Sequence, residues 1–298
     1  YDTIRIMMGN KLGMLIDYII IFTMIVTGIG MIAGGGALLE QQFGLPLIYG
    51  NLIMTLLTTL TLMLNLEKIV IAIGFLTPVL LLTLIIVCIY SIIDNTQSFE
   101  QLEPLVLQTK STMPDSLPNW FVSSINHASF NVTVGIGMAL VMGGNEKNLK
   151  SAVWGGVLGG VFIGAIILVS HFAIFSQIGV ITSLDADGKL KVTALPMLAI
   201  AGKFSSILSL IMTFIIFGMI YNTCVSMFYV FIARYNTMAT KRANIFIIIT
   251  MIIGYCVSFL GFTDIVGIFY PLIGYAGLLL IAMLLYAPFK LKKLKQRE

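Results

Sequence analysis

Long apolar runs separated by short polar connections are the feature of this sequence that most restricts its fold. A membrane-spanning helix needs roughly 20 mostly apolar residues, and eight segments approach that length. Charged residues occupy only 10% of the 298 positions, whereas a soluble protein carries about 25%. The sequence therefore predicts an all-α integral membrane protein, a single transmembrane domain over 1–298, with eight spans at 12–39, 46–64, 69–93, 120–142, 152–175, 205–233, 245–260 and 265–286.

Basic residues fall unevenly on the two sides that eight alternating spans define. Of the seventeen, thirteen lie on one side, and only Lys110, Lys189, Lys191 and Lys203 lie on the other. Because Lys and Arg concentrate in cytoplasmic loops, this split predicts that both ends of the chain are cytoplasmic. The basic residues form short clusters between apolar runs, so the net charge of +4 indicates a lipid bilayer as partner and no nucleic acid.

Polar side chains crowd into the fourth predicted span. Seven occur within eleven residues, and each would cost a few kcal/mol if it faced lipid unpaired. We therefore expect them to face protein or a water-filled cavity, with a helix interruption near 129–131 that exposes backbone groups to a substrate. In the alternative interpretation, the serines bond back to their own helix and Asn131 pins it to a neighbour. The seven are Ser123, Ser124, Asn126, His127, Ser129, Asn131 and Thr133.

The middle of the sixth predicted span carries a second polar group, Tyr221 to Thr223 with Ser226. Hydroxyl and amide oxygens suit a hard cation, so Asn222, Thr223 and Ser226 are candidate ligands for Na⁺; interhelical hydrogen bonding is the alternative. No acid lies at a predicted bilayer centre, which favours Na⁺ over H⁺ as a coupling ion. Asp17 and Asp264 lie near predicted interfaces, where we expect solvated or capping roles.

Three further patterns predict local structure. Five glycines between Gly155 and Gly164 suggest a face for close helix packing. The segment 185–188, Asp-Ala-Asp-Gly, predicts a tight turn, since most of the ligands of a calcium loop are missing. Gly-Met-Ile occurs at 30–32 and again at 218–220, each time in a long span followed by two shorter ones, which suggests an internal repeat.

With these residues in view, the chain resembles the YkvI family of bacterial membrane proteins. The stretch 33–44, Ala-Gly-Gly-Gly-Ala-Leu-Leu-Glu-Gln-Gln-Phe-Gly, carries much of the resemblance. That family is similar to transporters with the LeuT-type fold, in the superfamily of amino acid, polyamine and sodium symporters. The resemblance implies ten core helices in two inverted five-helix repeats, of which the eight spans would be helices three to ten. Two further helices would then precede Tyr1.

The resemblance also assigns roles to residues. The broken helix around the substrate would be 120–142, with Ser129, Phe130 and Asn131 at the break. The sodium site of that fold uses adjacent hydroxyl residues. Its nearest match here is Asn222-Thr223, with Ser226 one turn on, and only one of the adjacent pair is a hydroxyl, which departs from the pattern. A location in the bacterial cytoplasmic membrane follows from the resemblance too.

Together these observations predict a cation-coupled secondary transporter of a small, amino-acid-like solute that works by alternating access. The substrate would contact Asn126, His127, Ser129, Phe130 and Asn131. The alternative is a transport-inactive sensor or partner subunit with the same fold; its oligomeric state is left open. We expect no enzyme, because His-Glu-x-x-His and Gly-x-Ser-x-Gly are absent and the two histidines lie on different spans. We also expect no cofactor or metal beyond the coupling ion.

Overall fold

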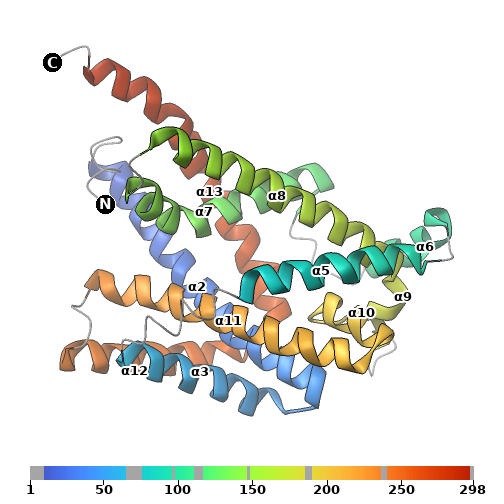
Figure 1. The fold of residues 1–298 in the computed structure, drawn as a ribbon. Coiled ribbons are helices and arrows are strands. Elements are labelled where there is room, and N and C mark those ends of the chain that lie inside the picture. Colours follow the sequence, from blue (N-terminus) through green and yellow to red (C-terminus); the bar gives the residue numbers. More distant parts are fainter. Residues whose placement is uncertain are drawn as a thin grey trace.

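The computed structural model describes residues 10–64, 76–95, 98–110, 117–145, 148–184, 190–235 and 240–295. Nearly all of them are helical, and long helices cross one another in a bundle (Figure 1). In chain order the elements are α2 (Asn10–Phe43), α3 (Leu47–Leu64), α5 (Leu76–Ile93), α6 (Phe99–Lys110), α7 (Trp120–Asn145), α8 (Leu149–Ser176), α9 (Ile178–Ile181), β1 (Thr182–Leu184), β2 (Leu190–Val192), α10 (Pro196–Phe204), α11 (Ser206–Tyr235), α12 (Lys241–Ser258) and α13 (Phe262–Lys295).

Six helices among the described residues are long and apolar enough to span a membrane: α2, α3, α8, α11, α12 and α13. The prediction of an all-α membrane protein is therefore confirmed. Two predicted spans are not among these six. The described part of 69–93 is the short apolar helix Thr77–Ile93, and α7 is a helix of 26 residues whose side chains are described only up to Ile136.

Local sequence signals explain several helix ends. The Asn148 side chain accepts hydrogen bonds from the Lys150 and Ser151 amides at 3.1 and 3.4 Å and so caps α8. Thr240 caps α12 in the same way, by accepting from the Ala243 amide at 3.1 Å. α2 ends at Gly44, whose φ of 67° only glycine adopts readily.

Two antiparallel helix pairs form the centre of the bundle. α2 packs against α11 along its length, with Asp17 beside Arg234 near one end and Gln42 bonded to Ser209 near the other. α3 packs against α12, and Asn51, near the start of α3, donates to Ser258 at the end of α12 at 2.9 Å. The largest apolar core lies between these pairs and α13.

Small residues allow α2 and α3 to approach each other closely. A Cβ atom added to Gly50 would lie 2.8 Å from the Gly36 Cα and 3.1 Å from the Gly36 carbonyl oxygen, both of them backbone atoms. A Cβ on Gly36 would overlap the Asn51 side chain. The glycine-rich stretch 33–37 is therefore a packing surface.

The predicted interruption of the fourth span is wrong. α7 is one continuous helix from Trp120 to Asn145. Three of its hydroxyl groups are satisfied within the helix, since Ser123, Ser124 and Thr133 each donate to the carbonyl four residues earlier, at 2.8 to 3.0 Å. Because these side chains find partners without breaking the backbone, their density does not interrupt the helix.

The connections also differ from expectation. The predicted connection between the third and fourth spans contains the helix α6. β1 and β2 pair antiparallel, with Ser183 opposite Lys191; the predicted turn at 185–188 lies outside the described residues. The glycine face of α8 is not a packing surface among the described residues, since no atom lies within 4 Å of a Cβ added at any of its five glycines.

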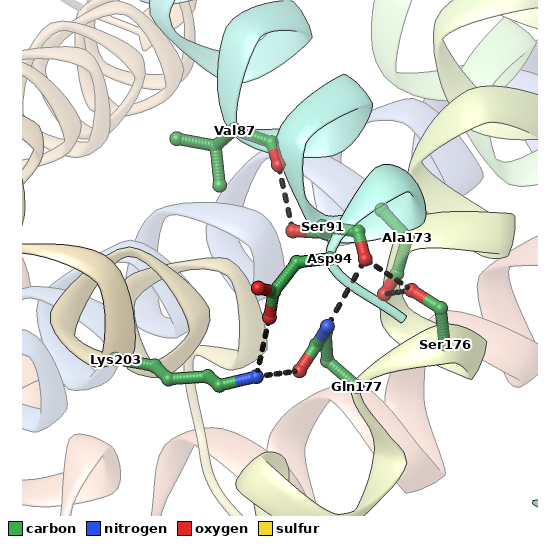
Figure 2. Close-up of polar contacts among 7 residues, drawn as sticks. All are labelled: Val87, Ser91, Asp94, Ala173, Ser176, Gln177 and Lys203. Carbon is green, nitrogen blue, oxygen red and sulfur yellow. Dashed lines mark hydrogen bonds and ion pairs between the residues drawn. The ribbon is translucent and has the colours of Figure 1, made fainter. Parts of the chain in front are cut away.

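A polar cluster joins the ends of α5, α8 and α10 (Figure 2). Gln177 donates to the Ser91 carbonyl at 3.0 Å, and its side-chain oxygen accepts from Lys203 at 2.8 Å. Lys203 also pairs with Asp94 at 2.8 Å, and Ser176 donates to the Ser91 carbonyl at 3.2 Å. Gln177 is 5% exposed, so the cluster fixes the end of α8 against α5.

Burial predicts which member of this cluster stabilises the fold. Asp94→Ala is expected to lower the free energy of unfolding by at most about 1 kcal/mol, because the ion pair is exposed. Gln177→Ala is expected to cost about 1–3 kcal/mol, because it removes buried hydrogen bonds. Unfolding of both purified variants in detergent measures the difference. An equal effect would contradict the assignment.

Candidate functional site

The buried polar face of α7 is held by α13. Asn126 Nδ2 donates to the Pro271 carbonyl at 2.8 Å, and Ser129 Oγ donates to the Gly274 carbonyl at 2.6 Å. Gly274 and Gly277 make this approach possible. A Cβ on Gly274 would lie 2.6 Å from the Asn126 carbonyl oxygen, and one on Gly277 would lie 2.9 Å from that of Ser129. In this structure Asn126 and Ser129 therefore join two helices.

The five predicted substrate residues do not converge on one pocket. His127 and Asn131 lie on the opposite face of α7 from Asn126 and Ser129 and are exposed. Asn131 donates to the His127 carbonyl at 2.8 Å, so it does not pin α7 to a neighbour. Phe130 is buried between the two faces and points toward α13.

Phe130 lies at a buried position where α2, α7 and α13 meet. We name this position the junction site and define it by Thr27, Gly30, Phe130 and Tyr270. The Phe130 and Tyr270 rings stack with centroids 4.2 Å apart. The Tyr270 hydroxyl lies 3.1 Å from the position of a Cβ on Gly30. Thr27 is three residues before Gly30 and so lies on the same face of α2.

Two hydroxyl groups of the junction site are buried without a hydrogen-bond partner among the described residues, those of Thr27 and Tyr270. A buried, unsatisfied polar group costs about 1–3 kcal/mol. Pro271 follows Tyr270 inside α13 and has no N–H, so the Gly267 carbonyl loses its usual partner within the helix. The junction site thus brings hydrogen-bonding groups together in an apolar surrounding, as a buried ligand site requires.

The three candidate ion ligands are adjacent on α11. Thr223 and Ser226 donate to the Met219 and Asn222 carbonyls at 2.9 and 2.8 Å, which leaves lone pairs on both hydroxyl oxygens. The side-chain oxygen of Asn222 is buried and has no hydrogen-bond partner among the described residues. The donor set therefore fits a hard cation in chemistry.

Other polar residues of α11 have structural partners. The Tyr221 hydroxyl pairs with that of Thr61, so Tyr221 faces α3. Thr58 donates to the Cys224 sulfur at 3.5 Å, and that thiol in turn donates to the Gly28 carbonyl at 3.7 Å. These contacts join α3, α11 and α2.

Asp17 is not solvated, contrary to the prediction. It is 3% exposed, and its carboxylate lies 3.1 Å from the Arg234 guanidinium. Its position near the start of α2 suggested contact with water, but the end of α11 covers it. Asp264 lies in the first turn of α13, where the positive end of the helix dipole stabilises a negative charge.

Sequence reasoning missed Thr27 and Tyr270. Thr27 is one of two threonines in a long apolar run, and such residues usually bond to their own helix, as Thr23 does. The proline after Tyr270, in the middle of a predicted span, was the available signal, because proline frees a carbonyl group at that depth. Their proximity depends on tertiary packing.

Comparisons with known proteins find relatives that match this chain over most of its length. No known family profile matches the chain, and no solved structure matches it. The chain is 25% identical over 281 residues to the uncharacterised protein YyaD of Bacillus subtilis, covering 94% of this chain and 77% of YyaD. It is also similar, at 22% identity over 280 residues, to the uncharacterised membrane protein YkvI of the same organism, covering 93% of this chain and 74% of YkvI.

Proposed function

We propose that this protein is a cation-coupled secondary transporter of a small amino-acid-like solute, with the solute at the junction site. Transport would proceed by alternating access, with no catalytic step. The proposal includes α5 and α7 as two further spans, and a cytoplasmic membrane location with the basic helix ends inside. One observation carries it: buried hydroxyl groups with no partner among the described residues, beside an aromatic pair where three helices meet inside an apolar bundle.

Helix packing supports two inverted repeats, α2-α3-α5 and α11-α12-α13. A two-fold axis in the membrane plane requires equivalent helices to run antiparallel, as α2 does against α11 and α3 against α12. It also requires α13 to meet α2 where α5 meets α11. Thr77 of α5 contacts Met219, and Tyr270 of α13 lies beside Gly30, one residue from Met31. Met219 belongs to one copy of Gly-Met-Ile, and Gly30 and Met31 belong to the other.

Different residues would bind the solute and the ion. The solute would accept or donate at Thr27 and Tyr270, whose unsatisfied groups a bound ligand would pair. Na⁺ would take oxygen from Asn222, Thr223 and Ser226 on α11. His127 and Asn131, on the exposed face of α7, would line the aqueous path to the junction site.

Transport in liposomes tests the proposal. The purified chain is reconstituted, and uptake of labelled amino acids is measured with an inward Na⁺ gradient, with an equal K⁺ gradient, and with an ionophore that collapses the gradient. We expect uptake that requires the Na⁺ gradient. Binding of a solute with no uptake across the amino acid panel would overturn the proposal and favour the sensor.

Tyr270→Phe separates a ligand-binding hydroxyl from a structural one. Because this hydroxyl is buried and no described residue pairs with it, its removal is expected to leave the free energy of unfolding unchanged or raise it by up to about 1 kcal/mol. Uptake is nevertheless expected to fall at least about tenfold, the effect of one lost hydrogen bond of about 1.4 kcal/mol.

Tyr221→Phe is the matched control, since its hydroxyl pairs with Thr61. We expect it to cost about 1 kcal/mol of stability and to change uptake little once folded protein is compared. Thermal unfolding in detergent and initial uptake rates give both quantities. Unchanged uptake in Tyr270→Phe would exclude the hydroxyl from the substrate site.

A further inference from the structure

A groove of about 890 Å³ opens where α2 begins, α11 ends and α12 begins. It is separate from the junction site. Its floor is apolar and comes from two helices, with Ile21 and Ile25 on α2 and Phe246 and Ile249 on α12. Ile249 is 52% exposed, so the groove is open along the outer face of the bundle. In a membrane protein this face meets lipid.

The rim of the groove is amphipathic. Tyr18 and Tyr235, which are 63% and 53% exposed, stand at the end of the groove nearest the helix termini. Arg242, in the first turn of α12, is exposed beside them, and none of the described residues that line the groove is a carboxylate. The nearby Arg234 is paired with Asp17, so the positive charge that the described lining brings to the rim is that of Arg242.

Three aromatic rings hold one wall in place. Phe231 packs against Tyr235 and Phe246 with centroids 5.6 and 5.7 Å away, and Tyr235 and Phe246 are 6.2 Å apart. Aromatic pairs at these separations stabilise one another beyond their buried area. The wall is therefore formed before any ligand arrives.

The length of the groove and the placement of its polar residues match a lipid. Ile249 follows Arg242 by seven residues, which is about 10 Å along a helix at 1.5 Å per residue. A cation thus stands at one end of an apolar trough, with two tyrosines at the level that such rings occupy beside headgroups. A soluble anion would leave the isoleucine floor uncovered, and an uncharged apolar solute would leave Arg242 without an anionic partner.

We propose that this groove binds one anionic phospholipid. The headgroup phosphate accepts hydrogen bonds from Arg242, Tyr18 and Tyr235 contact the glycerol region, and one acyl chain lies along Ile21, Ile25 and Ile249. Charge complementarity selects the occupant, because cations near a membrane surface attract anionic lipids. The apolar floor then fixes it at this place on the bundle.

Quenching by brominated lipids tests the proposal. The groove reporter is Tyr18→Trp in a chain that also carries Trp120→Phe and Trp154→Phe. The control reporter is the natural Trp154, kept in a Trp120→Phe chain. Trp154 is 63% exposed on α8 and lies one turn from Lys150, so it has a nearby cation but is not part of this groove. Both proteins are reconstituted in vesicles containing brominated phosphatidylglycerol or brominated phosphatidylcholine of the same acyl chains.

At the groove reporter, we expect phosphatidylglycerol to be preferred over phosphatidylcholine about fivefold more than at Trp154, or about 1 kcal/mol. The reason is that Arg242 hydrogen-bonds a headgroup held in the groove, whereas Lys150 only attracts it. Arg242→Gln is expected to abolish this excess and Arg242→Lys to keep most of it. Excess inorganic phosphate should not relieve the quenching. Equal preference at both reporters, an excess that survives Arg242→Gln, or displacement by phosphate would each overturn the proposal.

Discussion

Asp17→Leu is expected to lower the free energy of unfolding by about 3–5 kcal/mol, because it leaves the buried Arg234 guanidinium without its carboxylate partner. Side-chain exposures of 5% for Asp17 and 17% for Arg234 place the pair away from solvent.

The double variant Asp17→Leu with Arg234→Met separates charge from packing. Replacing both members of a buried ion pair with apolar side chains often costs little, so we expect it to recover most of the stability that the single variant loses. Chemical unfolding of the purified proteins in detergent gives the three values. Asp94→Ala, which breaks an exposed ion pair with Lys203, is the control. A loss below about 1 kcal/mol in Asp17→Leu would contradict a buried pair.

The sequence allowed accurate prediction of the helices where local patterns decide them. Apolar length defined α2, α11 and α13 as spans because the energy of placing a helix in lipid depends on its own residues. The glycine-rich stretch 33–37 is a surface for close approach in the structure, to α3. That function could not be read from composition, since the five glycines of α8 look similar and contact nothing among the described residues.

The predictions that the structure contradicts concern residues whose partners lie far away in the sequence. Asp17 was expected to be solvated, because nothing nearby in the sequence indicates that Arg234 covers it. The polar face of α7 suggested a broken helix, but Asn126 and Ser129 find acceptors on α13, whose carbonyl groups no local pattern reveals. Tyr270 and Thr27 were missed for the same reason. Neither stands out in the sequence, and only packing buries both hydroxyls away from any partner in the described part of the chain.

Gly274→Val is expected to separate α7 from α13 and to lower the free energy of unfolding by about 3 kcal/mol or more. The new Cβ would lie 2.6 Å from the Asn126 carbonyl oxygen and would overlap the Asn126 side chain. Overpacking a core costs about 1–3 kcal/mol when side chains can move. Here one of the obstructing atoms is backbone, and the hydrogen bond from Asn126 to the Pro271 carbonyl is lost as well.

The same change should reach the junction site, because Gly274 is one turn from Tyr270 and Asn126 is one turn from Phe130. We expect Gly274→Val to reduce uptake even in the fraction that folds, since the stacked rings depend on α7 lying against α13. Gly135→Val is the control: it introduces the same residue in α7 at a position where no neighbouring atom in the described structure lies within 4 Å of the new Cβ. Thermal unfolding and uptake of the two variants decide the point. Equal stability of Gly274→Val and Gly135→Val would mean that α7 and α13 are not in this contact, and the junction site would lose its third helix.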